Sequence, residues 1–202
     1  FPYTTLFRSG LFRLRQFVQD DGHILCAPDQ AAREMERFLR ALPAFYAAFG
    51  FDRLDVVLSG RPKDRVGSDA DWDRAERELS EAAERAGLRP QFVPGQGAFY
   101  GPKIEVSLLD SLGRAWQCGT LQLDFFLPER FDVAYVDADG ARRRPVMLHR
   151  ALAGSLERFL AVLLEHHRGR LPAWIAPEQI RVMPVGCHDD AAQREAEVFV
   201  RD

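Results

Sequence analysis

The chain has 202 residues, of which 47% are hydrophobic and 28% charged, and its formal net charge at pH 7 is −3. That length allows one or two domains with a sizeable core, and the weak net charge excludes an overall electrostatic preference for nucleic acid. We expect neither a membrane span nor a signal peptide, because no apolar run is long enough and the first residues lack a basic start. Cys26, Cys118 and Cys187 are too widely spaced for a disulfide framework, so we expect a reducing cytoplasm.

The first nine residues, Phe1–Ser9, begin without Met and fit poorly with the sequence that follows. They resemble translated adapter sequence, so we expect residues 1–9 to be non-native and exclude them from the fold prediction. We also expect the chain to be a fragment that lacks its natural N-terminal part, and its last residues, Arg201-Asp202, fall inside a predicted helix.

A strand is predicted from Phe12 to His23, and alternate side chains of a strand share one face. Leu14 and Val18 then point toward a core, while the opposite face is polar. Two interpretations stay open: a solvated face of an antiparallel sheet, or a face that binds a ligand. The polar face would carry cations, a ring, an amide, a carboxylate and an imidazole, from Arg13, Arg15, Phe17, Gln19, Asp21 and His23.

Further elements follow from periodicity and turn signals. Helices are predicted over residues 29–48, 68–85 and 154–167; Pro43 is expected to kink the first, and Ser68 to cap the second. A Gly-rich loop over 94–103 holds an aromatic ring, a hydroxyl and a cation, as loops that approach ligands often do. Strands are predicted over 54–58, 91–93, 103–109, 116–125 and 131–136, with an extended segment over 145–149. This order predicts an α+β fold, in which an antiparallel sheet is flanked by helices.

The composition changes over residues 171–177, a segment typical of a linker. A strand is predicted over 180–185 and a helix after Asp189, which indicates the start of a second, α/β-type domain. We therefore expect one domain over residues 10–173 and the beginning of another over 174–202.

Short motifs then resemble the signatures of class II aminoacyl-tRNA synthetases. Gly154-Ser155-Leu156-Glu157-Arg158 resembles their third motif, and Phe12–Phe17 resembles the second half of their second motif. Further blocks are specifically similar to the threonyl-tRNA synthetase family, namely residues 19–26, 97–103, 116–125 and 144–150. The resemblance covers residues 10–202, with its blocks in order at plausible spacing.

The resemblance implies a class II synthetase catalytic fold, partial over residues 10–173, followed from residue 174 by the start of an anticodon-binding domain. It implies activation of threonine by ATP, with Mg²⁺, to threonyl-adenylate, and then transfer to tRNA(Thr). A cytoplasmic location without a membrane partner is a further expectation. The family dimerises through its first motif, which this chain lacks, so a homodimer is expected of the intact protein and left open for the fragment.

The resemblance also implies roles for individual residues. The reaction would proceed by positioning and charge stabilisation, without a protein nucleophile. The motif-two arginine expected on the α-phosphate lies upstream and is absent from the chain. Catalytic roles fall on Arg13, Lys103 and Arg158. ATP-binding roles fall on Arg13, Phe17, Gln117, Thr120 and Arg158, with adenine between the Phe17 ring and the Arg158 guanidinium. Amino-acid-binding roles fall on Gln19, Asp21, Tyr100, Lys103, Gln122 and Ser155.

A zinc ion held by one Cys and two His belongs to the same family pattern, and the two His positions match His23 and His149. The Cys lies upstream, and neither Cys26 nor Cys118 occupies its position, so we expect the fragment to bind zinc poorly and to be inactive alone. Zinc with three protein ligands keeps positions open for the amine and hydroxyl of threonine. Asp21 can accept the hydroxyl's hydrogen bond, and valine offers no hydroxyl.

Three alternatives accompany this interpretation. A synthetase-like protein that binds nucleotide or tRNA without catalysis would keep the fold and lose the reaction, and the intact Arg158 and both histidines argue against it. A zinc hydrolase would be expected to carry a His-Glu-x-x-His helix, which is missing. A class II enzyme for proline or serine would not be expected to combine Asp21, His23 and His149.

Overall fold

The computed structural model of the chain describes residues 10–183 together with residues 190, 191, 194 and 197. The chain divides into two compact units, Phe1–His166 and His167–Asp202. Phe1–Ser9 and most of the helix predicted after Asp189 lie outside the described residues. None of the helices in the described part is long and apolar enough to cross a membrane.

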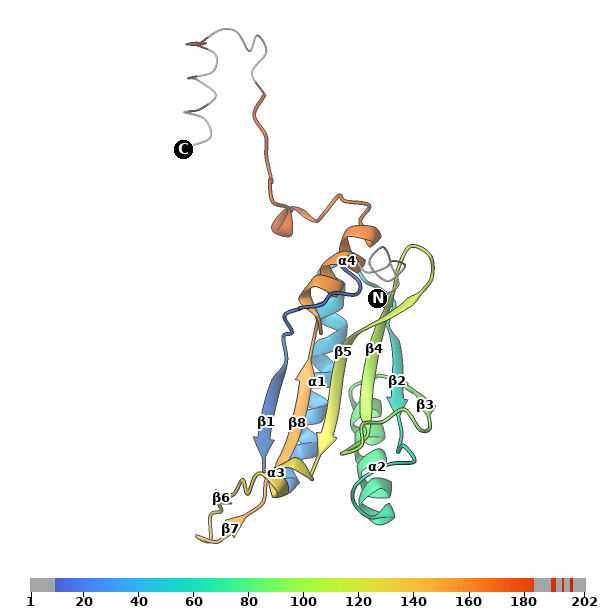
Figure 1. Cartoon of the computed structure of the whole chain (residues 1–202). Coiled ribbons are helices and arrows are strands. Elements are labelled where there is room, and N and C mark those ends of the chain that lie inside the picture. The colour runs from blue at the N-terminus through green and yellow to red at the C-terminus, as the bar shows by residue number, and fades with distance from the viewer. Residues whose placement is uncertain (1–9, 184–189, 192–193, 195–196, 198–202) are drawn as a thin grey trace. The chain divides into compact units, whose positions relative to one another are not determined.

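A six-stranded sheet forms the centre of the first unit (Figure 1). Its order is β1-β8-β5-β4-β2-β3, and all neighbours are antiparallel except β2 and β3. The strands are β1 (Gly22–Cys26), β2 (Asp55–Ser59), β3 (Gln91–Val93), β4 (Lys103–Leu109), β5 (Ala115–Asp124) and β8 (Val146–Ala151). The predicted α+β class is confirmed, with one parallel pair at the edge because a helix connects β2 to β3.

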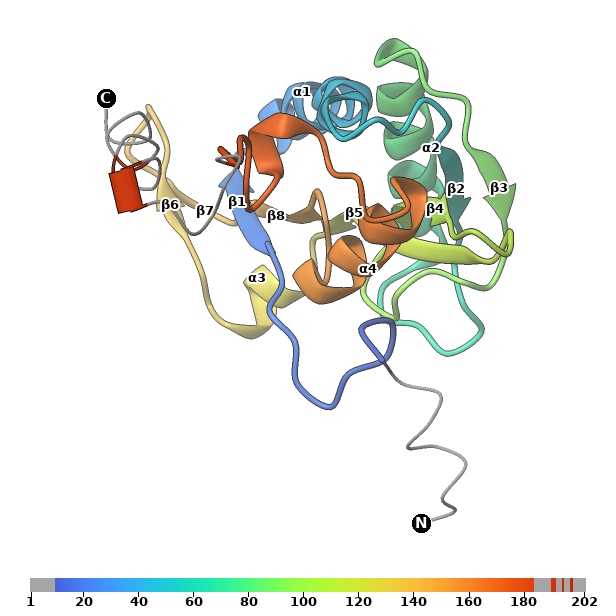
Figure 2. The same ribbon diagram turned by 90° about the horizontal axis from the view of Figure 1, so that it is seen from above.

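Two long helices, α1 (Pro28–Ala48) and α2 (Asp69–Arg85), lie side by side on one face of the sheet (Figure 2). Ser68 caps α2 as predicted: its Oγ accepts from the Asp71 N–H at 3.2 Å. Pro43 lies inside α1, which continues past it. Two further helices are the short α3 (Leu127–Arg130) and α4 (Leu156–His166), and η2 (Ala173–Ile175) is a 3-10 turn in the second unit.

The core fills the space between the sheet and the two long helices. Alternation along each strand turns one set of side chains toward α1 and α2 and the other set toward the opposite face. Fully or almost fully buried strand side chains are Leu58, Ile104, Val106, Leu121, Leu123 and Leu148. The helices contribute the equally buried Met35, Leu39, Leu42, Trp72 and Leu79. The opposite face is left for polar side chains.

The strand predicted from Phe12 to His23 is wrong over most of its length. Only Gly22–Cys26 forms β1, and residues 10–21 have no regular strand structure. The reason is the length of the neighbour: β8 ends at Ala151, so the last pair of this ladder is Gly22 with Arg150. Before it, a single bridge joins Gln19 to Ser155.

Two other strand predictions are wrong over most of the residues that the structure describes. Within 131–136 only β6 (Tyr135–Val136) is a strand, and it pairs with β7 (Arg142–Arg143) in a separate two-stranded sheet. Phe131 ends α3 and Asp132 adopts a positive φ of 51°, which breaks an extended segment there. Residues 180–183 have no regular structure, and residues 184 and 185 lie outside the described part.

Removal of the Tyr46 hydroxyl should destabilise the first unit. This fully buried side chain of α1 donates to the Leu152 carbonyl at 2.6 Å, which ties the helix to the turn after β8. Tyr46→Phe leaves that carbonyl without its partner, at an expected cost of about 1–3 kcal/mol in unfolding free energy. Urea unfolding measures it against Tyr135→Phe, outside the core, which should change stability by less than about 0.5 kcal/mol. Equal effects of the two variants would contradict this account.

Candidate functional site

A row of polar side chains crosses the sheet on the face opposite α1 and α2. The strand register places Ser59 beside Lys103, Lys103 beside Gln122, Gln122 beside His149, and His149 beside His23. Four of these five residues were predicted as site residues from separate sequence blocks, and the register brings them into one line.

The two histidines at the end of this row are close neighbours. The ring centroids of His23 and His149 lie 4.6 Å apart with the planes at 75°. The Nε2 atom of His149 forms a hydrogen bond of 2.8 Å with Oδ2 of Asp124, whose side chain is fully buried. The other oxygen of Asp124 accepts from the N–H groups of Phe126 and Leu127 at 2.8 and 2.9 Å. Asp124 therefore fixes the orientation of the His149 ring.

The Gly-rich loop before β4 brings Tyr100 over the middle of the row. Its hydroxyl donates to Oε1 of Gln122, whose amide in turn donates to Thr120 at 3.4 Å. Burial, followed by the nearby carboxylates of Asp124 and Asp21, raises the pKa of Tyr100 above its usual value. The phenol is therefore a protonated donor at neutral pH.

Lys103 supplies a cation on the same face. Its Nζ lies 3.0 Å from a carboxylate oxygen of Glu105, and the other oxygen of Glu105 accepts from the hydroxyl of Ser59. Both Lys103 and Glu105 are partly buried, so this pair is less screened than a surface pair. Asp21, which precedes β1, is exposed.

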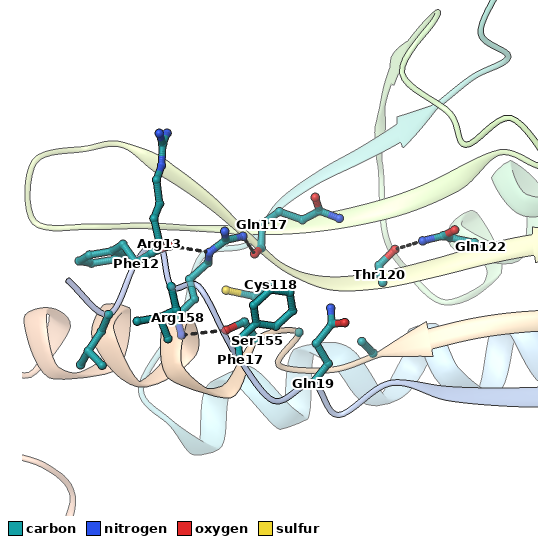
Figure 3. Close-up of a pocket in the computed structure, with 14 residues that line it drawn as sticks. Phe12, Arg13, Phe17, Gln19, Gln117, Cys118, Thr120, Gln122, Ser155 and Arg158 are labelled. Carbon is teal, nitrogen blue, oxygen red and sulfur yellow. Dashed lines mark hydrogen bonds between the residues drawn. The ribbon is translucent and has the colours of Figure 1, made fainter. Parts of the chain in front are cut away.

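A cavity of about 440 Å³ adjoins the row, between the segment before β1, strand β5 and the start of α4 (Figure 3). Phe12 and Arg158 stand at one end and Gln122 at the other. Predicted site residues make up more than half of its lining, which consists of Leu11, Phe12, Arg13, Leu14, Phe17, Gln19, Gln117, Cys118, Thr120, Gln122, Ala151, Gly154, Ser155 and Arg158.

Arg158 is held at its end of the cavity by backbone carbonyls. Its Nε donates to Phe12 O at 3.3 Å and its Nη1 to Gln117 O at 3.4 Å, while its own N–H donates to Ser155 Oγ at 3.2 Å. Phe17, the predicted partner of Arg158 in an adenine sandwich, lines the same cavity and is 51% exposed. The two side chains therefore border one space of a size suited to a small ligand.

Trp116 is a neighbour of these cations to which the sequence patterns assign no role. Its ring stacks on Phe12 with centroids 4.5 Å apart, and the guanidinium carbons of Arg13, Arg114 and Arg158 lie 5.9, 5.6 and 5.5 Å from its centroid. Such cation–π contacts hold guanidinium groups in place without neutralising their charge. The only sequence signal was its position one residue before Gln117 in a block that resembles the family.

Asp110 holds Trp116 from the hairpin between β4 and β5. Its buried carboxylate accepts from the Trp116 indole at 2.8 Å, from Arg114 Nε at 2.6 Å, and from the Leu112 and Arg114 N–H groups at 2.9 and 2.8 Å. Burial raises the pKa of Asp110, but these hydrogen bonds outweigh burial and lower it to about 2. The carboxylate therefore stays ionised at any pH near neutral.

Cys118 lines the cavity, and its thiol is protonated. Burial raises the pKa of its thiol to about 12, opposed by the charge of Arg158. The thiol is therefore protonated at neutral pH, and a thiolate nucleophile at this position is disfavoured.

Gly154 shapes the turn that leads into α4. Its φ is +69°, and a Cβ there would lie 2.4 Å from the Cys118 carbonyl oxygen, so only glycine fits. The turn thus packs directly on β5 and brings Ser155 and Arg158 to the cavity.

The chain matches a known family over most of its length. Residues 4–167 match the model described as tRNA synthetase class II core domain (G, H, P, S and T). The chain therefore belongs to the class II tRNA synthetase core-domain family.

Within that family, the chain is similar to the threonine–tRNA ligases, which confirms the resemblance seen in the sequence. It is 55% identical to the ligase of Burkholderia multivorans over 176 residues, which is 87% of this chain and 28% of the relative. The ligase of Dichelobacter nodosus is 50% identical over 192 residues, 95% of this chain and 30% of the relative. The chain thus spans less than a third of the length of these curated relatives.

A solved structure agrees with this placement. The crystal structure described as the RNA binding domain of threonyl-tRNA synthetase from Cryptosporidium parvum superposes with a TM-score of 0.84 at 43% identity. The match covers 96% of this chain and 49% of that one.

Acid should weaken the fold partly through Asp110. Because the folded-state pKa is lowered from 3.8 to about 2, the stability contributed by this group is present above pH 4 and is lost as the pH falls toward 2. Asp110→Asn removes the ionisation, so unfolding free energy should fall less steeply with acid over that range. Chemical unfolding at a series of pH values measures the slope, and a slope equal to that of the wild type would contradict the assignment.

Proposed function

We propose that the chain is part of a threonine–tRNA ligase whose site activates threonine with ATP and transfers it to tRNA(Thr). The observation that carries the proposal is the continuity of the polar row from Lys103 to His23 with a cavity lined by Arg13 and Arg158. An amino acid and a nucleotide could then meet where Gln122 belongs to both. The names of the similar ligases support the same assignment.

The cavity is proposed as the nucleotide half of the site. Arg158 and Arg13 would contact the triphosphate and its Mg²⁺, since guanidinium groups suit phosphate oxygens and the charge that develops on them. Phe17 would stack on the adenine, while Gln117 and Thr120 would contact the nucleotide from β5. Trp116 supports this proposal by holding the arginines beside the cavity.

The polar row is proposed as the amino-acid half. Lys103 would neutralise the substrate carboxylate and approach the reacting centre, and the protonated Tyr100 would donate a hydrogen bond. Gln19, Gln122 and Ser155 would orient the substrate at the junction of the two halves. Asp21 would accept the hydrogen bond of the threonine hydroxyl. These groups act by positioning and charge stabilisation, so no protein nucleophile is needed.

The donor set fits zinc in part. Two imidazoles lie together and one is oriented by a buried carboxylate, as is usual for metal-binding histidines, but the described residues provide no third His, Cys, Asp or Glu to complete a cluster. We assign His23 and His149 as two ligands and expect the third from a Cys elsewhere in the gene product. Bound zinc would supply open coordination positions for the amine and hydroxyl of threonine.

The remaining features of the proposal concern the whole gene product. Residues 10–173 would belong to the catalytic domain and residues 174–202 would begin the anticodon-binding domain. A cytoplasmic homodimer is proposed for the intact protein. The 202-residue chain alone would be inactive, because it spans less than a third of the similar ligases.

Amino-acid-dependent exchange between ATP and pyrophosphate tests the activity in the gene product that contains this chain. We expect exchange with threonine, weak exchange with serine and none with valine or proline; a hydroxyl-binding site can reject an analogue without that group by about 10⁴-fold or more. His23→Ala should lower threonine-dependent exchange at least about 100-fold, since loss of even an outer partner of a metal ligand costs 10–100-fold. The control is Asp139→Asn in the β6–β7 turn, which is absent from the cavity lining and should keep wild-type exchange. Exchange with none of the amino acids would refute the proposed function.

Metal content tests the ligand assignment separately from activity. In the same gene product, His23→Ala and His149→Ala should each lower the affinity for zinc about tenfold or more. Less zinc should therefore remain bound to each variant after dialysis. Cys26→Ser should leave zinc content unchanged, because this buried thiol of β1 is not assigned as a ligand. Zinc retained in full by both histidine variants would overturn the assignment.

A further inference from the structure

Asp20 joins two parts of the site that lie far apart in sequence. Both oxygens of its half-buried carboxylate accept hydrogen bonds from the turn between β8 and α4. Oδ2 accepts from the Leu152 N–H at 2.7 Å, Oδ1 accepts from the Gly154 N–H at 2.8 Å, and the Ala153 N–H lies 3.1 and 3.2 Å from the two oxygens. In return, the Asp20 N–H donates to the Gly154 carbonyl at 3.3 Å.

A second carboxylate makes the reciprocal connection. Glu157, in the first turn of α4, accepts from the Val18 N–H at 3.0 and 3.1 Å and from the Ser155 hydroxyl at 3.1 Å. The Leu156 N–H donates to Val18 O at 2.9 Å. Each segment therefore uses an acidic side chain to bind backbone N–H groups of the other.

Both of the joined segments contribute side chains to the lining of the cavity. Residues 12–19 contribute Phe17 and Gln19, and the turn with the start of α4 contributes Ser155 and Arg158. The segment before β1 has no strand ladder, so a single bridge, two backbone hydrogen bonds and the bonds of Asp20 and Glu157 hold it against the turn. Hydrogen bonds to an ionised carboxylate are about twice as strong as neutral ones, which suits this task.

We propose that Asp20 is a positioning residue for nucleotide binding. Its carboxylate holds the segment that carries Phe17 at a fixed distance from the start of α4, which carries Arg158. The proposal rests on the proposed function for the identity of the nucleotide, ATP. Asp20 itself faces the turn and not the cavity, since it is absent from the cavity lining while Gln19 is part of it. Its loss should weaken ATP binding more than threonine binding.

Asp20→Asn is the sharpest variant, because it keeps the shape of the side chain and replaces one acceptor oxygen by an NH₂ group. Both oxygens of Asp20 accept hydrogen bonds from backbone N–H groups. Whichever way the Asn amide is turned, its NH₂ group would therefore face a backbone N–H group. Asp20→Ala removes the acceptors without adding a donor and serves if the Asn variant does not fold. The matched control is Asp139→Asn, a carboxylate that also accepts a backbone N–H, from Ala141 at 2.9 Å, but lies in the β6–β7 turn outside the cavity.

Steady-state exchange kinetics in the gene product give the first readout. We expect the KM for ATP to rise about tenfold in Asp20→Asn or Asp20→Ala, with the KM for threonine changed by less than twofold, and the control unchanged. A rise of both KM values together would indicate a general loss of structure and overturn the proposal, as would unchanged values for ATP.

Hydrogen–deuterium exchange separates this proposal from the proposed function. The amides of residues 152–154 and of Val18 should exchange at least tenfold faster in the Asp20 variants than in the wild type and the Asp139→Asn control, and β4 and β5 should keep wild-type rates. If no amino acid supports ATP–pyrophosphate exchange in the wild type, the proposed function fails, and calorimetric ATP affinity replaces the KM. Unchanged amide exchange, or unchanged ATP affinity, would then refute the role of Asp20.

Discussion

The backbone hydrogen bonds among β1, β8, β5 and β4 are the constraint on which the site depends. Their register sets His23, His149, Gln122 and Lys103 side by side, although these residues come from four separate parts of the chain. A slip of one residue in any pair would turn that strand's set to the other face. The buried leucine, isoleucine and valine side chains of these strands make such a slip costly, because the same slip would expose them. The core therefore protects the geometry of the polar face.

Carboxylates without a predicted role hold that polar face in order. Asp124 orients His149, Asp110 holds Trp116 beside the arginines, and Asp20 fixes the turn before α4. Each of these carboxylates takes part in hydrogen bonds with groups of the protein itself. Such fully hydrogen-bonded carboxylates keep the neighbouring side chains in one arrangement without a ligand.

The sequence predicts well where local signals suffice. The cap at Ser68, the alternation over residues 103–109 and the turn signals around β5 place α2, β4 and β5 within one residue of their observed ends. The segment before β1 fails because strand formation needs a partner, and the end of β8 is not visible in the pattern of residues 12–23. The residues of the polar row were predicted from the resemblance to a family. Their order across the sheet follows only from the pairing of the strands. Asp20, Asp124 and Trp116 were missed because their partners lie 25 or more residues away, or on another element.

The burial of Cys118 affects how readily its thiol reacts. Electrophiles and peroxides attack the thiolate, not the thiol. Burial raises the pKa of the Cys118 thiol to about 12, so this group is protonated at neutral pH. Burial and protonation together therefore disfavour attack on this thiol by the oxidants and alkylating agents that react with exposed thiolates.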